Sequence, residues 1–92
     1  MRHLLLMLAL AAPVAADPLE LYRWFHTHPE LSKKETQTSQ RLAQELKSLG
    51  LEVEQGIGGN GIMALLRGQP GGPVVLYRAD MDALPVQEAT GL

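Results

Sequence analysis

Apolar residues return every three or four positions in two stretches of the chain. The first stretch runs from Asp17 to Pro29 and the second from about Lys33 to Leu49. This spacing predicts two helices, each with one apolar face. Asp17 and Pro18 are typical of a first helical turn, and Pro29 ends the first pattern because the residue before a proline avoids helical angles.

The second helix has its own start and stop signals. Ser32 and Glu35 match a capping box, in which the two side chains bind each other's backbone amides. Gly50 is placed to close the helix in the left-handed conformation. We therefore expect this helix to follow directly after Ser32.

The pattern changes to that of strands after Gly50. Leu51–Glu54 alternates between apolar and polar residues, whereas Ile62–Leu66 and Val74–Tyr77 are short apolar runs. A glycine-rich loop and a Pro-Gly-Gly-Pro turn separate the three segments. The order predicts an α/β fold with two helices followed by three strands, which form part of a mixed sheet. We expect the last two strands to form an antiparallel pair at its edge.

Composition narrows the class of protein. The chain has 92 residues, a formal net charge of −2 and no cysteine. Nucleic-acid binding needs a basic face, which this charge does not supply. Small exported domains are usually stabilised by disulfide bonds, which a chain without cysteine cannot form. We therefore expect this chain to be a portion of a larger domain.

The first 16 residues are typical of an export signal. Arg2 and His3 provide a polar, positive start, Leu4–Ala12 is too short to span a bilayer, and small residues precede a cleavage point after Ala16. We expect residues 1–16 to be a signal peptide and residues 17–92 to be a periplasmic or secreted segment that is not held in a membrane. A buried N-terminal helix is the alternative.

Two acids follow the third predicted strand. Asp80 and Asp82 are two positions apart, so on an extended chain both carboxylates point to the same side. Ligand sites in open α/β sheets lie beyond the carboxyl ends of strands, and carboxylates there are suited to holding a metal ion or orienting its ligands. The alternative is a pair of solvated loop acids.

Two other features have simpler explanations. His26 and His28 could share a metal ion on a strand, but they close a predicted helix, where residues two apart face different directions. We expect a helix-end histidine that interacts with terminal carbonyls. The glycine loop 56–61 leads into a strand instead of a helix, so a hairpin loop is favoured over a dinucleotide site. Trp24 and Phe25 are expected to be core residues.

Three segments together resemble one enzyme family. His26-Thr27-His28-Pro29-Glu30-Leu31-Ser32, the loop Gly58–Gly61 leading into 64–68, and the segment Arg78–Glu88 are similar to motifs of the metal-dependent amidohydrolases. That family includes hippurate hydrolase, N-acyl amino acid hydrolases and indole-acetyl amino acid hydrolases, which are relatives of carboxypeptidase- and aminoacylase-like metallopeptidases.

The resemblance implies hydrolysis of the amide bond of N-acyl amino acids by a two-metal site, with Zn, Mn, Ni or Co as candidate ions, and a homodimer as a possible assembly. It places Asp82 at a supporting acid of the metal site and Asp80 at a position that holds a histidine ligand in the wider group. The family's later Cys-Gly-His-Asp motif, its glutamates and further histidines have no counterpart in this sequence.

From this resemblance we expect residues 17–92 to be the N-terminal part of the mixed-sheet catalytic domain of an exported metallo-amidohydrolase, a fragment that is incomplete and inactive alone. The remaining metal ligands would lie outside this chain. Two rivals are an amidohydrolase barrel that uses both histidines as ligands and a small exported non-enzymatic binding or structural domain.

Overall fold

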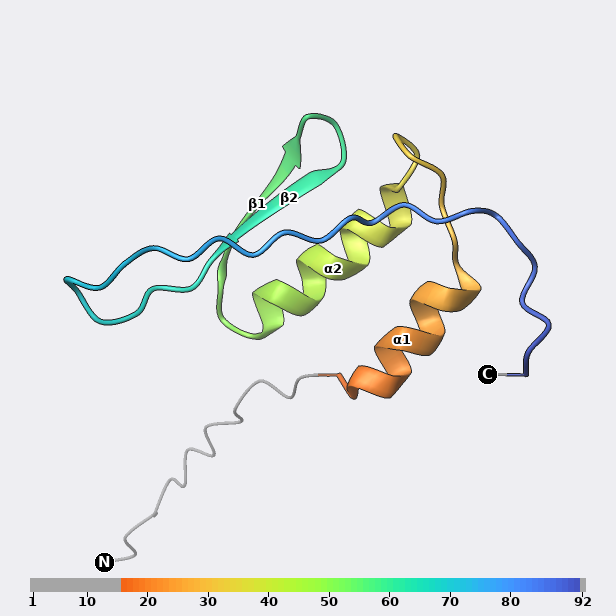
Figure 1. Ribbon diagram of the computed structural model, residues 1–92, viewed down its shortest axis with the longest axis horizontal. Coiled ribbons are helices and arrows are strands. Elements are labelled where there is room, and N and C mark those ends of the chain that lie inside the picture. Colours follow the sequence, from red (N-terminus) through yellow and green to blue (C-terminus); the bar gives the residue numbers. More distant parts are fainter. Residues whose placement is uncertain (1–15, 92) are drawn as a thin grey trace, which may run out of the picture.

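The computed structural model describes residues 16–91, so the predicted signal peptide falls almost wholly outside the described residues. Helix α1 spans Pro18–Thr27 and helix α2 spans Thr36–Ser48. Strands β1 (Glu52–Ile57) and β2 (Gly61–Leu65) follow, and an extended segment completes the described chain (Figure 1). The predicted order of two helices followed by strands is confirmed.

Helix α1 begins and ends where its sequence predicts. The Asp17 carboxylate accepts a hydrogen bond from the Leu19 amide at 3.0 Å, and Pro18 occupies the first turn. The helix ends at Thr27, directly before His28 and Pro29. Local capping chemistry is therefore sufficient to define this element.

Helix α2 starts differently from the prediction. It begins at Thr36, and the side chain of the preceding N-cap residue, Glu35, makes no capping hydrogen bond to the helix. The Glu35 carboxylate accepts from the amide of Lys33, which has the left-handed φ of 69°. The predicted capping box of Ser32 and Glu35 is wrong, because a turn at Lys33 separates Ser32 from the helix and the Glu30 carboxylate caps α2 instead. At the other end Gly50 has a φ of 85°, as expected for a helix stop.

Strands β1 and β2 form an antiparallel hairpin. Glu52 pairs with Leu65 and Val53 with Ala64, and the register shifts at a bulge before Ile57. The loop 58–60 is thus a chain-reversal turn, which confirms the hairpin interpretation of the glycine-rich segment. A Cβ at Gly61 would lie 2.2 Å from the Ile57 carbonyl oxygen, so only glycine fits there.

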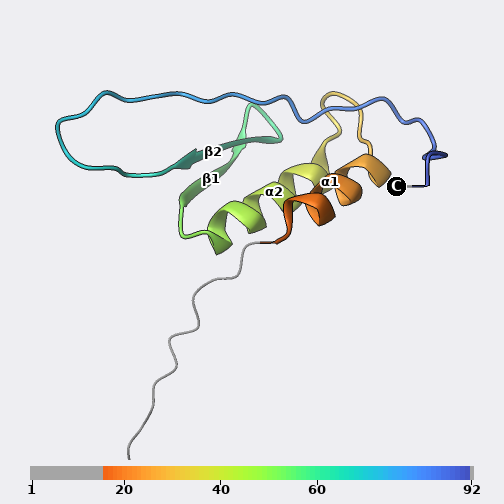
Figure 2. The same cartoon turned by 60° about the horizontal axis from the view of Figure 1, so that its bottom comes forward.

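The predicted third strand is extended but is not paired with any strand of the described residues. Val74–Tyr77 belongs to the extended C-terminal segment that runs past the hairpin and α2 (Figures 1 and 2), and its four side chains are 86–93% exposed. The predicted antiparallel pairing of the last two strands is wrong. The short turn after β1 brings β1 and β2 together at a low entropic cost, and β2 pairs with its predecessor.

The buried residues are few and small. Thr38, Ser39 and Ala43 lie on α2, which packs against both strands of the hairpin. Trp24 and Phe25, predicted to be core residues, are half-buried. In the part of the chain that the structure describes, no helix has the length and apolar character to cross a membrane. Most large apolar side chains therefore remain at the surface.

Candidate functional site

The paired acids lie on the extended segment after residue 73. An Asp80 carboxylate oxygen accepts from the Arg78 guanidinium at 3.0 Å, and both side chains are exposed. Asp82 is also exposed, with the half-buried Met81 between the two acids. The segment presents both carboxylates outside any regular strand.

The described residues do not by themselves build a metal site. Among residues 16–91, no group of three or more histidine, cysteine, aspartate or glutamate side chains is placed to hold a metal ion. Asp80 is engaged by a neighbouring cation, which competes with a metal ion for its oxygen. The donor set of residues 16–91 therefore does not fit a two-metal centre by itself.

His26 and His28 take separate partners. The Nδ1 atom of His28 lies 2.7 Å from the Trp24 carbonyl oxygen, and its ring stacks on the indole of Trp24. The ring of His26 stacks on Tyr22, and its Nε2 atom contacts the Glu88 carboxylate. The expected helix-end histidine is confirmed at His28, and the two imidazoles do not converge on one ion as the barrel rival requires.

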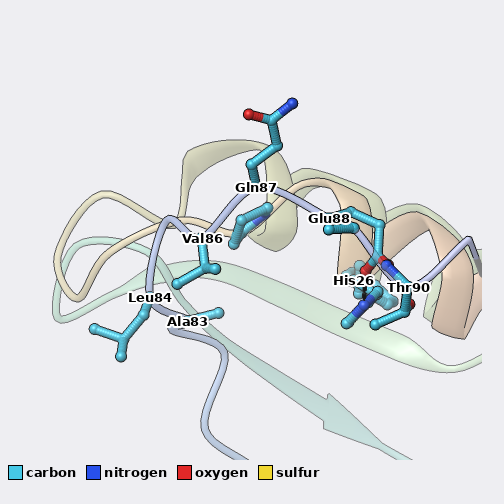
Figure 3. A pocket seen from close by; sticks show the side chains of 10 residues that line it. His26, Ala83, Leu84, Val86, Gln87, Glu88 and Thr90 are labelled. Carbon is cyan, nitrogen blue, oxygen red and sulfur yellow. Dashed lines mark hydrogen bonds and ion pairs between the residues drawn. The ribbon is translucent and has the colours of Figure 1, made fainter.

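A groove of about 370 Å³ lies between the end of α1 and the segment after Asp82. Figure 3 shows His26, Glu88 and Thr90 converging at one end, whereas Gln87 points away from them. Apart from Gln87 and these three, the lining is apolar and consists of Phe25, Pro29, Ala83, Leu84, Val86 and Ala89. The groove is thus an apolar wall with one polar end, whose groups bind one another.

The polar end of the groove stabilises the ionised form of Glu88. The Thr90 hydroxyl donates to the Glu88 carboxylate and, with the Thr90 amide and nearby His26, lowers the pKa of Glu88 despite some desolvation. Glu88 is therefore an anion at neutral pH. Because its side chain is only 17% exposed, its partners on the protein replace much of its contact with water.

Glu30 joins three parts of the chain. Its carboxylate accepts from the Gln37 amide at 3.1 Å, from the Thr38 amide at 2.6 Å and from the Thr38 hydroxyl at 2.7 Å. Its backbone carbonyl accepts from the amide of Ala83 at 2.8 Å. One residue therefore contacts both the first turn of α2 and the position next to Asp82.

Sequence reasoning missed both Glu30 and Glu88 as residues of this site. Each lies inside a recognised motif, but neither has a local pattern that names its partner. Glu30 lies eight residues before Thr38, and Glu88 lies 62 positions after His26 in sequence. The sequence shows only that each motif contains an acid. The partner of each acid is visible only in the three-dimensional structure.

Most of the chain is similar in sequence to several known proteins. It is 47% identical over 75 residues to "Thermostable carboxypeptidase 1" of Saccharolobus solfataricus, a match that covers 80% of this chain and 19% of that protein. It is 46% identical over 76 residues to "N-acyl-L-amino acid amidohydrolase" of Geobacillus stearothermophilus, covering 82% and 20% respectively. It is 43% identical over 67 residues to "Hippurate hydrolase" of Campylobacter jejuni, covering 73% and 18%.

The chain spans about a fifth of the length of these curated relatives. No family profile matches the chain. No solved structure matches it either.

Proposed function

Because the chain belongs to the amidohydrolase family of these relatives, we propose that the whole protein hydrolyses the amide bond of N-acyl amino acids, including hippurate-like substrates. The observation that carries this proposal is 43–46% identity to proteins named for that activity, over 73–82% of this chain. A protein named "N-acetyl-L-cysteine deacetylase" from Bacillus subtilis is a further relative, at 40% identity. The shared chemistry is cleavage of an acyl group from a small amine-bearing molecule.

The proposed reaction depends on divalent metal ions, two of them, from the set Zn, Mn, Ni and Co. Asp82 is assigned to support the metal site, and Asp80 is the less favoured candidate for direct ligation. Asp82 is exposed, so it is accessible to groups from outside the described residues. The other ligands would have to come from such groups, since residues 16–91 hold no cluster of their own.

The same proposal includes the location, the activity of the isolated chain, the partner and the assembly of the protein. Residues 1–16 direct export and are then removed, and the mature protein works in the periplasm or outside the cell. The 92-residue chain alone is inactive. The whole protein acts on a small molecule and assembles as a homodimer.

The test uses the natural gene product that carries these residues. The purified protein is stripped with a chelator, and release of the amino acid from hippurate and from N-acetyl amino acids is measured before and after each of the four metal ions is restored. We expect release to vanish on stripping and to return with at least one ion. An absence of release from every substrate with every ion would overturn the proposal. Chain 1–92, assayed beside it, should release nothing.

A further inference from the structure

The carboxylate of Glu30 acts as an N-terminal cap for α2 from outside the helix. It binds the amides of Gln37 and Thr38 and the hydroxyl of Thr38, which is 5% exposed. The amides of a first helical turn have no partner within the helix, and a negative charge there is also favoured by the helix dipole. The side chain of Glu30 is therefore fixed to the start of α2.

The Glu30 side chain is charged at neutral pH. Desolvation raises the pKa of Glu30, but the hydrogen bonds from Thr38 and Gln37 and the nearby His28 outweigh it and lower the pKa overall. Hydrogen bonds to an ionised acceptor are roughly twice as strong as neutral ones. The attachment to α2 is thus the strong part of this link.

The backbone of the same residue holds the segment that carries the acids. From 66 to 80 every residue of this segment is exposed, and Ala83, directly after Asp82, donates its amide to the Glu30 carbonyl. The loop containing Glu30 and the segment containing Ala83 lie side by side in both views (Figures 1 and 2). A shift of the Glu30 backbone would therefore move the chain next to Asp82.

We propose that Glu30 is a positioning residue for Asp82: its carboxylate fixes the loop to α2, and its carbonyl thereby fixes the backbone at Ala83. This role rests on the proposed function, because Asp82 is assigned to the metal site there. The Glu30 carboxylate is engaged by α2, so its assigned effect on Asp82 passes through the backbone. Its loss would displace Asp82 without removing any group that takes part in the reaction.

The experiment compares Glu30→Gln with Glu35→Gln in the natural gene product. Glu35 is the matched control, since its carboxylate lies in the same loop and accepts from the Lys33 amide, but its backbone does not contact Ala83. Thr38→Val is a second test variant that keeps Glu30 and removes only the hydroxyl donor. Amide hydrogen exchange at Ala83 and the steady-state constants kcat and KM are measured for all of them.

We expect exchange at Ala83 to become about tenfold faster in Glu30→Gln, and to rise in the same direction by less in Thr38→Val. We expect kcat to fall by about tenfold or more while KM changes little, because a misplaced group next to the reaction costs turnover. The Glu35→Gln control should change neither exchange nor kcat by more than about twofold.

Two results would overturn the proposal. Unchanged exchange at Ala83 in Glu30→Gln means that the carboxylate does not fix the segment, whatever the activity. Faster exchange with an unchanged kcat in an active enzyme means that the link does not position Asp82. If the natural protein hydrolyses no N-acyl amino acid, the proposed function fails, and the exchange measurement alone then decides whether Glu30 holds the segment.

Discussion

The imidazole of His28 closes helix α1 by binding the carbonyl of Trp24, four residues earlier. The Nδ1 to oxygen distance is 2.7 Å, and the two rings stack with centroids 4.3 Å apart and an angle of 12° between their planes. A carbonyl only accepts, so Nδ1 carries the proton in this contact. The contact satisfies one of the carbonyls that a helix end leaves without a partner.

Replacing His28 by alanine should therefore affect stability and not metal content. We expect His28→Ala to lower the free energy of unfolding of the natural gene product by about 1 kcal/mol, the usual value of a lost hydrogen bond. Denaturant unfolding measures the loss, and elemental analysis measures the bound metal. Loss of a full equivalent of metal would instead identify His28 as a ligand.

The Glu30 contacts predict a dependence of stability on pH. The pKa of Glu30 in the folded protein is lower than its ordinary value of 4.5. Its contribution to stability is thus fully present above pH 4.5 and is lost as the pH falls through the lower folded pKa. Thermal unfolding of the wild type and Glu30→Gln should differ by a constant amount near neutral pH, and the difference should shrink in acid. A difference that grows in acid would contradict this assignment.

The geometry of the hairpin turn predicts that a substitution of Gly61 destabilises the protein. Gly61→Ala would place a Cβ 2.2 Å from the Ile57 carbonyl oxygen, so the turn must rearrange. We expect a loss of about 2 kcal/mol or more in the free energy of unfolding. Gly68→Ala is the matched control, because nothing lies within 4 Å of a Cβ there. Equal effects of the two substitutions would show that the turn does not have this close approach.

The two acids should differ in their effect on activity. In the natural gene product, Asp82→Asn is expected to lower kcat/KM by about 10- to 100-fold, as is usual for groups that orient metal ligands. Asp80→Asn should cost less, because Asp80 is already paired with Arg78 at the surface. Asp17→Asn is an isosteric control that alters only the cap of α1. A larger loss at Asp80 than at Asp82 would reverse the assigned roles.

The exposed segment Val74–Tyr77 predicts how residues 17–92 unfold when they are prepared alone. Val74–Tyr77 places four large side chains in water, and the buried residues of the described chain are small. Residues 17–92 should unfold with little cooperativity in calorimetry, because too few apolar contacts form in one unit. A sharp two-state transition would favour the rival of a small complete binding or structural domain.

Local signals in the sequence predicted the elements that depend on near neighbours. Asp17 and Pro18 define the start of α1, and the glycines after β1 define the hairpin turn. These features need only backbone angles and hydrogen bonds within a few residues. They were predictable for that reason.

Features that join distant segments were not predictable in the same way. The cap of α2 comes from Glu30 and not from Ser32, because the turn at Lys33 places an acid from further back against the helix. The contact of His26 with Glu88 joins residues from the two ends of the described chain. Pattern alone carries no information on such pairs.

The residues on either side of the exposed run Val74–Tyr77 disfavour aggregation of the chain. Pro73 cannot donate a main-chain hydrogen bond, and Arg78 places a charge that repels its own copy in any stacked, in-register assembly. Between them lie four exposed apolar residues, three of them β-branched or aromatic, which favour pairing with another exposed strand. Pro73 and Arg78 therefore disfavour pairing of this run with the same run of another copy of the chain.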